Sequence, residues 1–240
     1  MARSDFTIAA IDAGTTTVRA VIAACRAGEG IRIAGVGTMP SDGVTKSTII
    51  DSAAFVPIAR GAMEGAERDA RIQVDDVFVT IGGGHVHSTN VAAVLPILDS
   101  DETVHEEHIE QLLEKAKGNS AEKGREFLHT IPQEYRLGSH AGVLNPVGLQ
   151  AARIEAGVHV ITADRTILEN HCRAFNDAGF RVADVCFSVI AGGACILSEQ
   201  DKKDGVLLVD IGGGSCSYAV YFNNTVYYSN VFAVGGDHIT

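Results

Sequence analysis

Short apolar runs separated by turn-forming residues make up the first part of the chain. Residues 7–11, 18–24 and 31–37 each predict a strand, with Gly14 and the Gly28-Glu29-Gly30 segment between them. These runs follow one another directly, with no helical pattern between them. The sequence therefore predicts a meander of antiparallel hairpins.

A helix is predicted next, at residues 51–68, because apolar side chains recur there at helical spacing. Pro57 lies within this pattern, although proline fits easily only in the first turn of a helix. A buried strand is predicted at residues 77–81, directly before Gly82-Gly83-Gly84. The apolar positions of the helix are Phe55, Ile58, Ala59, Ala62, Met63 and Ala66.

The pattern changes near His85. Thr103 and Glu106 have the spacing of a capping box and predict the start of a second helix. The apolar face of that helix is Ile109, Leu112, Leu113 and Ala116. Strands are predicted around it at residues 91–97, 127–137 and 153–161. A unit of this size predicts a small α+β module inserted into a larger domain.

The first pattern resumes after Thr162. Helices are predicted at residues 167–178, ending at Gly179, and at residues 188–197. The predicted strands are residues 182–185, a buried strand at 205–211, then 218–222 and 225–234, the last two joined by a turn at Asn223-Asn224.

Two segments of the chain repeat one design. In each, an apolar strand ends in Asp, a turn of glycines and small hydroxyl residues follows, and a second strand begins. The aspartates are Asp12 and Asp210. The turns are Gly14-Thr15-Thr16-Thr17 and Gly212-Gly213-Gly214-Ser215. The two aspartates lie far apart along the chain, and such a separation is natural for the two halves of a duplicated fold.

The composition of these turns suits anion binding. Glycines let the backbone approach a phosphate closely, successive N–H groups form a concave site for anionic oxygen, and hydroxyl groups add donors. An aspartate at the strand end suits Mg²⁺, which is typically held by one or two carboxylates together with phosphates and water. For either turn alone, an ordinary glycine-rich hairpin is the alternative. The presence of two matching turns favours phosphate binding over this alternative.

Other glycine motifs are excluded by their context. The chain contains no G-x-x-x-x-G-K-[ST] segment, which a P-loop requires. Gly82-Gly83-Gly84 follows a strand but lacks the further glycine of a dinucleotide-binding fingerprint.

Charge and composition narrow the class of protein. The 240 residues carry a formal net charge of −11, and no cluster of basic residues is present, which argues against nucleic acid as a partner. Neither a signal peptide nor a membrane-spanning run is predicted. The five cysteines are scattered and predict reduced thiols in a cytosolic protein. The nine histidines have no Cys, Asp or Glu at a spacing that completes a tetrahedral metal site.

The paired turns resemble the two phosphate loops of the actin-like ATPase superfamily, and within it the chain is most similar to the FtsA family of bacterial cell-division proteins. The resemblance runs from Ile8 to Thr240. Its most specific stretches are residues 79–88, 128–135 (Leu-His-Thr-Ile-Pro-Gln-Glu-Tyr), 145–149, 158–162 and 235–240 (Gly-Gly-Asp-His-Ile-Thr).

This resemblance implies an α/β, actin-like (ribonuclease H-like) fold with an inserted α+β subdomain and an incomplete second lobe. The implied parts are residues 1–84 as the first part of subdomain 1A, 85–162 as the inserted subdomain 1C, 163–200 as the second part of 1A, and 201–240 as the start of subdomain 2A. The length corresponds to only the first part of such a fold, and a second helical subdomain and a C-terminal membrane-anchoring helix are expected beyond it.

The resemblance also implies a function. The family suggests a cytoplasmic, ATP-binding scaffold at the inner face of the cell membrane, which polymerises and tethers the FtsZ ring during septum formation. FtsZ, other divisome proteins and further copies of the protein are the implied partners, with the membrane reached only through the C-terminal tail. A PilM-like type IV pilus assembly protein, or an active ATPase or phosphotransferase of the superfamily, are the alternatives.

The implied nucleotide site combines ATP and Mg²⁺. Asp12 and Asp210 are expected to hold Mg²⁺ through water. Phosphate contacts are expected from Gly14, Thr15, Thr16, Thr17, Gly212, Gly213, Gly214, Ser215, Gly235 and Gly236. Two departures from the family pattern matter. The first turn ends in Thr17 where FtsA often has lysine, and Phe187-Ser188 replaces a glutamate of related ATPases, so no general base for hydrolysis is predicted.

Overall fold

The computed structural model describes residues 6–26, 30–99 and 101–238. The predicted turn residues Gly28 and Glu29, and the Ile239-Thr240 end of the last specific stretch, lie outside these residues. A five-stranded sheet in the order β11-β6-β1-β2-β3 organises the first lobe. β1 (Phe6–Ala13), β2 (Thr17–Arg26) and β3 (Gly30–Pro40) form an antiparallel meander, as predicted. β6 (Asp76–Ile81) runs parallel to β1, and β11 (Arg181–Phe187) runs parallel to β6.

Two helices pack on one face of this sheet, α1 (Ser52–Ala70) and α3 (Arg165–Asp177). Asp51 caps α1 by accepting a hydrogen bond from the Ala54 N–H at 3.1 Å, which fixes the predicted helix start. α1 continues through Pro57, beyond the first turn where proline is easiest. The rings of Phe55 and Phe175 meet edge to face, with centroids 5.3 Å apart, and join the two helices inside one core.

Glycines of β3 bring α1 unusually close to the sheet. A β-carbon on Gly37 would lie 1.8 Å from the Ala62 carbonyl oxygen, and one on Gly35 would lie 2.1 Å from the Ala66 carbonyl oxygen. Both contacts are with helix backbone, so no side chain can move aside to relieve them. The residue facing each of these glycines is an alanine of α1, and the layers meet through small side chains.

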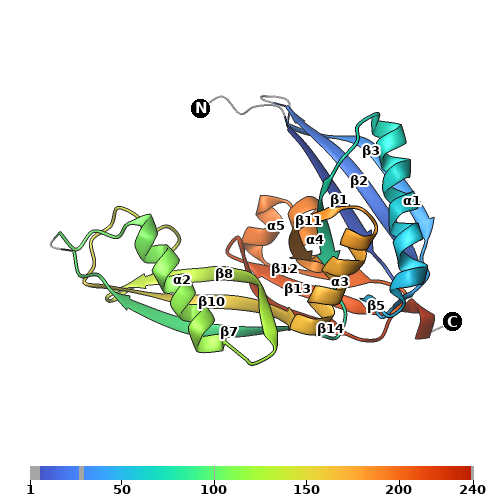
Figure 1. Cartoon of the computed structure of the whole chain (residues 1–240). Helices are drawn as coiled ribbons and strands as arrows, with labels where there is room; N and C mark the ends of the chain where they lie inside the picture. Colours follow the sequence, from blue (N-terminus) through green and yellow to red (C-terminus); the bar gives the residue numbers. More distant parts are fainter. Residues whose placement is uncertain (1–5, 27–29, 100, 239–240) are drawn as a thin grey trace.

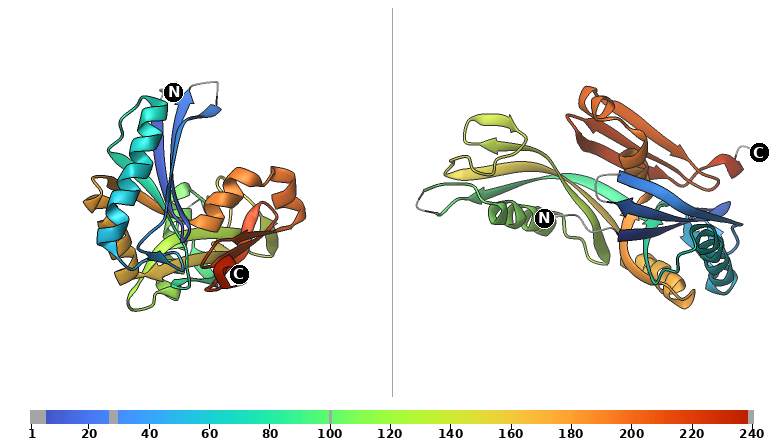
Figure 2. Two further views of the ribbon diagram at one scale, coloured as in Figure 1. Left: turned by 90° about the vertical axis from the view of Figure 1, so that its right-hand side faces the viewer. Right: turned by 90° about the horizontal axis from the view of Figure 1, so that it is seen from above.

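The inserted module forms a separate sheet in the order β7-β10-β8-β9, with α2 (Glu106–Ser120) packed against it. Figures 1 and 2 show it projecting as an arm from the first lobe. Its strands are β7 (Val86–Pro96), β8 (Arg125–Leu137), β9 (His140–Val143) and β10 (Arg153–Asp164). Leu112 and Ala116 are fully buried on the predicted apolar face of α2. The short β9 hairpin strand was not predicted.

The predicted cap of α2 at Thr103 is wrong. Thr103 pairs with Gln150 in an isolated β-bridge, and the Val104 N–H donates to the Leu149 carbonyl at 2.9 Å. The chain is therefore still extended at residues 103–104, and His105 becomes the N-cap, with its N–H donating to Nδ1 of His108 at 3.0 Å. The local capping pattern does not start the helix here, because the backbone of residues 103–104 pairs with a distant loop.

α4 (Ser188–Ile196) leads from β11 to the second lobe, which contains α5 (Glu199–Asp204) and a three-stranded antiparallel sheet. The strands are β12 (Val206–Ile211), β13 (Cys216–Phe222) and β14 (Thr225–Phe232), followed by the 3₁₀ turn η1 (Gly236–His238). α5 was not predicted. It is short and begins in a capping box formed by Ser198 and Asp201.

The prediction that the strand before the second turn is buried is also wrong. Leu207, Val209 and Ile211 on β12 are 58%, 46% and 69% exposed. Their equivalents in the first half of the repeat are Ala9, Ile11 and Ala13 of β1, all of which lie in the core beneath α1 and α3. No described helix covers the same face of β12, so an apolar strand is left with one open face.

A small hairpin formed by β4 (Val44–Thr45) and β5 (Thr48–Ile49) places its tip between the lobes.

Within the described part of the chain, no helix is both long and apolar enough to span a membrane.

A polar network fastens the inserted sheet to β14 of the second lobe. His159 of β10 donates from Nδ1 to Oδ1 of Asn90 at 2.6 Å and accepts at Nε2 from the Ser229 hydroxyl at 2.8 Å. Gln133 of β8 donates to the Tyr227 carbonyl at 2.8 Å. His159 and Ser229 are fully buried. The inserted module is therefore attached to both lobes, by the chain on one side and by this network on the other.

Acid is expected to weaken this attachment. Burial, and to a smaller extent the nearby His129, lowers the pKa of His159 to about 4. The unfolded ring takes up a proton near pH 6.5 while the folded ring stays neutral. The contribution of the neutral His159 ring to the free energy of unfolding is therefore fully present above pH 6.5. It is lost as the pH falls toward 4, by up to about 1.4 kcal/mol per pH unit. His171, whose pKa burial also lowers to about 4, adds to the effect.

The measurement is urea unfolding between pH 4 and 7.5. His159→Gln should flatten the pH dependence, because the buried group no longer titrates. The exposed His140 provides the control, and His140→Gln should retain the wild-type slope. An unchanged slope in His159→Gln would show that the buried ring does not cause the acid sensitivity.

Candidate functional site

The two repeated turns lie at the ends of corresponding strands in the two lobes. Asp12 faces Arg19 across the β1–β2 ladder, and Asp210 faces Ser217 across the β12–β13 ladder. Each turn is thus the tip of an antiparallel hairpin with an aspartate at its base. The predicted repeat is a pair of equivalent hairpins.

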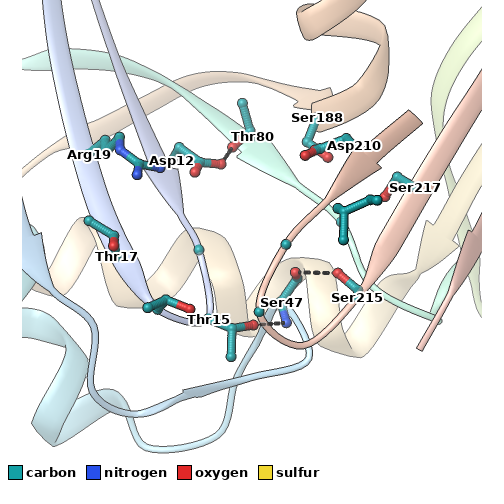
Figure 3. A pocket seen from close by; sticks show the side chains of 16 residues that line it. Asp12, Thr15, Thr17, Arg19, Ser47, Thr80, Ser188, Asp210, Ser215 and Ser217 are labelled. Carbon is teal, nitrogen blue, oxygen red and sulfur yellow. Dashed lines mark hydrogen bonds between the residues drawn. The ribbon is translucent and has the colours of Figure 1, made fainter. Parts of the chain in front are cut away.

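One cavity of about 340 Å³ lies between these hairpins, and Figure 3 shows the side chains around it. Both aspartates line it, together with most of the predicted turn residues. The predicted residues among its lining are Asp12, Gly14, Thr15, Thr16, Thr17, Asp210, Gly212, Gly213 and Ser215. Residues separated by almost 200 positions of sequence therefore face the same space.

The first turn depends on glycine for its close approach. A β-carbon on Gly14 would lie 2.7 Å from the Thr17 carbonyl oxygen, inside the turn itself. In the second turn the Gly212 N–H donates to the Ser215 carbonyl at 2.9 Å, which closes the loop. Both turns are compact, with their hydroxyl-bearing residues at the cavity.

The tip of the β4–β5 hairpin links the two turns. The Ser47 N–H donates to Oγ1 of Thr15 at 3.1 Å, and the Ser47 and Ser215 hydroxyls are 2.9 Å apart. Lys46 and Ser47 both have positive φ, at 50° and 59°, which a tight two-residue hairpin of this kind requires. Ser47 thereby connects the Thr15 hydroxyl of the first lobe to the Ser215 hydroxyl of the second lobe.

The two carboxylates lie in different local environments. Asp12 accepts a hydrogen bond from the Thr80 hydroxyl of β6. Burial, and then the negative charge of Asp12, raises the pKa of Asp210 above its usual value. Two carboxylates that repel each other beside several hydroxyl oxygens are a donor set that suits Mg²⁺, a cation that takes oxygen ligands. The residues present therefore fit the cation expected from the sequence.

Three predicted residues do not line the cavity. Gly214 is buried behind the second turn, where a β-carbon would lie 2.8 Å from the Cα of Lys46. Gly235 packs against the backbone of the same turn, and the Gly236 N–H donates to the Gly212 carbonyl at 2.9 Å. These glycines support the shape of the turn from outside.

Seven lining residues were not predicted as site residues: Arg19, Ser47, Thr80, Gly82, Ser188, Ile211 and Ser217. A sequence signal was available for two of them. Arg19 and Ser217 follow Thr17 and Ser215 by two positions, which places them on the same side of their strands. Gly82 directly follows β6, and Ile211 ends β12. Thr80, Ser188 and Ser47 reach the cavity from β6, α4 and the β4–β5 hairpin, and no local pattern points to them.

The histidines lie mostly apart from this cavity. An exposed group far from it brings Asp99, Asp101 and His105 within 4.8 Å of one another, which spacing in the sequence did not reveal. Nε2 of His108 lies 3.4 Å from Oδ2 of Asp99. Exposed acidic groups of this kind are common without a metal ion, and nothing further is assigned to it.

Fold and site together define the class. Two lobes that each present a strand, an aspartate and a glycine turn to a shared cavity have the actin-like ATPase fold. The PilM–PilN type IV pilus biogenesis complex contains a chain of similar structure, with a TM-score of 0.68 over 96% of this chain and 62% of that one, at 14% sequence identity. This likeness concerns the fold alone.

Sequence comparison then shows which known proteins the chain is similar to. Residues 83–162 match the family described as the SHS2 domain inserted in FtsA. The cell division protein FtsA of Escherichia coli (strain K12) is 31% identical over 233 residues, which is 97% of this chain and 55% of that protein. FtsA of Borreliella burgdorferi is 30% identical, over 97% of this chain and 56% of that protein. The chain is thus a homologue of the FtsA cell division proteins, as its motifs predicted, and spans about half of their length.

Proposed function

We propose that this chain binds ATP with Mg²⁺ in the cavity between its lobes and serves as part of an actin-like cell-division scaffold. The observation that carries the proposal is the convergence of two Asp–glycine hairpins, one from each lobe, on one cavity. Such paired turns offer phosphate groups backbone N–H and hydroxyl donors from both sides. The FtsA relatives supply the cellular setting, which is division.

Each residue has a proposed part in this site. Asp12 and Asp210 hold Mg²⁺ through its water ligands, and Thr15, Thr16, Thr17 and Ser215 donate hydroxyl hydrogen bonds to phosphate oxygens. Gly14, Gly212 and Gly213 let the backbone approach those oxygens. Gly214, Gly235 and Gly236 keep the second turn in shape.

The larger assembly follows from the family. In this proposal the protein polymerises, binds FtsZ and other division proteins, and reaches the inner face of the membrane through a C-terminal tail. Residues 1–84 and 163–200 form subdomain 1A, 85–162 form the inserted subdomain 1C, and 201–240 begin subdomain 2A. The match to the SHS2 domain at residues 83–162 supports this division.

Two alternative functions, a PilM-like role and an active ATPase, make different predictions. A PilM-like role is supported by the similar fold but by only 14% identity, against about 30% to FtsA. An active ATPase needs a base that orients water. The carboxylates among the cavity-lining residues are the two proposed for Mg²⁺, so we expect at most slow hydrolysis. Steady-state phosphate release far above the spontaneous rate would favour the enzyme.

Asp210→Asn should separate metal-assisted from metal-free binding. Losing the carboxylate should weaken MgATP binding about 10- to 100-fold, because a charged hydrogen-bonding group contributes about 1.5–3 kcal/mol. In EDTA the variant should bind ATP at least as well as the wild type, because the lost carboxylate no longer repels the phosphates. Isothermal titration calorimetry measures both, with Glu64→Gln on the exposed side of α1 as the charge-matched control. Equal MgATP affinity in Asp210→Asn and wild type would contradict the proposed site.

A further inference from the structure

A short hairpin outside the internal repeat reaches the cavity. The tip of β4–β5 is Lys46-Ser47, and Ser47 lines the cavity together with Thr15 of the first turn and Ser215 of the second. Figure 3 shows these three side chains next to one another, joined by two hydrogen bonds. The phosphate contacts proposed above come from the two turns, and Ser47 has no part in them.

Glycines let two other turns pack closely against this tip. A β-carbon on Gly83, just after β6, would lie 2.5 Å from the Lys46 carbonyl oxygen. One on Gly214 would lie 2.8 Å from the Lys46 Cα and 2.8 Å from Oγ1 of Thr15. Main chains from both lobes therefore fix the tip in position, and Ser47 belongs to a packed junction.

The hydrogen bond from Ser47 to Thr15 can have only one direction. The Ser47 N–H is a donor, so Oγ1 of Thr15 accepts it, at 3.1 Å. A hydroxyl group has one proton and two lone pairs. With a lone pair of Thr15 taken by Ser47, its proton is left for another acceptor, and Thr15 lines the cavity. Ser47 thus favours the orientation in which Thr15 donates into the cavity.

An anion in the cavity would give the bond to Ser215 the same polarity. The two hydroxyl oxygens are 2.9 Å apart, and either can be the donor. An anion accepts hydrogen bonds, so it selects the arrangement in which Ser47 donates to Ser215 and Ser215 donates to the anion. Accepting one hydrogen bond also polarises the Ser215 hydroxyl and makes it a stronger donor. Ser215 is only 6% exposed, which limits the water that could replace Ser47.

Resting on the proposed nucleotide site, we propose that Ser47 is a positioning residue that orients the Thr15 and Ser215 hydroxyls as phosphate donors from the two lobes. It acts through these two hydroxyls and needs no contact of its own with the phosphate. Because Ser47 is hydrogen-bonded to both, it also holds the two donors at a fixed separation. They can then meet neighbouring oxygens of one phosphate chain in the orientation that binding requires.

Ser47→Gly tests the part of this role that passes through Ser215. Glycine adopts the positive φ of this position without strain and keeps the N–H that bonds Thr15, so only the hydroxyl is lost. MgATP binding to the 240-residue chain, titrated by calorimetry, should weaken about 3- to 10-fold, the effect of one neutral hydrogen bond. The phosphorus NMR resonances of the bound nucleotide should also shift, because the donor to a phosphate oxygen is changed.

A double-mutant cycle shows whether the effect depends on Ser215. Ser215→Ala should weaken binding by itself, since a phosphate donor is removed. In that background Ser47→Gly should cost no further affinity, because the hydroxyl that Ser47 orients is gone. Thr45→Ala is the matched control, because it removes an exposed hydroxyl from the same hairpin. It should bind MgATP like wild type.

The outcomes separate the two proposals. If wild type binds MgATP and Ser47→Gly binds it equally well or more tightly, the role of Ser47 is refuted while the nucleotide site stands. If wild type does not bind MgATP, the proposed function fails, and the inference fails with it. If Ser47→Gly lowers the affinity by the same factor with and without the Ser215 hydroxyl, Ser47 acts on the fold as a whole and the inference is wrong.

Discussion

Replacing Gly37 with alanine is expected to lower the free energy of unfolding by about 3 kcal/mol, the upper part of the range for overpacked sites. The midpoint of thermal unfolding should fall by about 6–12 °C, given about 2–4 °C per kcal/mol for a chain of this size. The reason is steric. The added methyl would lie 1.8 Å from the Ala62 carbonyl oxygen and 2.7 Å from the Ala66 nitrogen, both in the backbone of α1.

Relief of this contact requires movement of a whole element. α1 is held on its other side by Phe55, Met63 and their neighbours in the core with α3. If the helix lifts from β3 to admit the methyl, those core contacts open as well. Thermal unfolding followed by circular dichroism measures the effect.

Gly118→Ala provides the control with the opposite sign. Gly118 lies in α2, is exposed, and a β-carbon there would meet no atom within 4 Å. Alanine should therefore stabilise the helix by up to about 1 kcal/mol, because it is the better helix former. If Gly37→Ala proves as stable as wild type, the close contact between β3 and α1 is not present in solution.

The second large effect is expected at Gly235, a residue outside the cavity lining. A β-carbon on Gly235 would lie 2.4 Å from the Gly213 carbonyl oxygen and 2.5 Å from the Gly212 carbonyl oxygen. Gly235→Ala should displace the second turn, and displacement of binding groups by about 1 Å can cost about 100-fold. MgATP affinity should fall by about that factor in calorimetry, although no ligand-contacting side chain has changed.

The neighbouring glycine is the matched control. A β-carbon on Gly236 would lie 3.8 Å from the Gly212 carbonyl oxygen, an ordinary contact, and alanine keeps the N–H that bonds that carbonyl. Gly236→Ala should bind MgATP like wild type. Equal losses in both variants would mean that Gly236, too, is part of the binding surface, as the sequence pattern alone suggests.

Much of the secondary structure is predictable because its causes are local. Short apolar runs and Gly14 are enough to indicate the β1–β2 hairpin, and Asp51 and the spacing of Phe55 and Ala59 indicate α1. The similarity of the two Asp–glycine segments is enough to indicate a duplicated fold. These features depend on neighbours within a few residues, which the sequence displays directly.

The errors have a common cause in distant contacts. Thr103 has a capping pattern, yet its backbone pairs with Gln150, and the helix begins later. β12 is as apolar as a buried strand, yet its Leu207 face is open because no described helix packs there. In both cases the local signal is genuine and the outcome depends on what packs against it.

The sequence by itself determined that this protein has two hairpins with an aspartate and a glycine turn, and that they resemble the phosphate loops of FtsA. Only the tertiary structure decided that the hairpins share one cavity, that Arg19 and Ser47 belong to it, and that Gly235 supports it from outside. The physical reason is that a turn is shaped by adjacent residues. A cavity is shaped by lobes whose relative position depends on contacts such as those of Ser47 with Thr15 and Ser215.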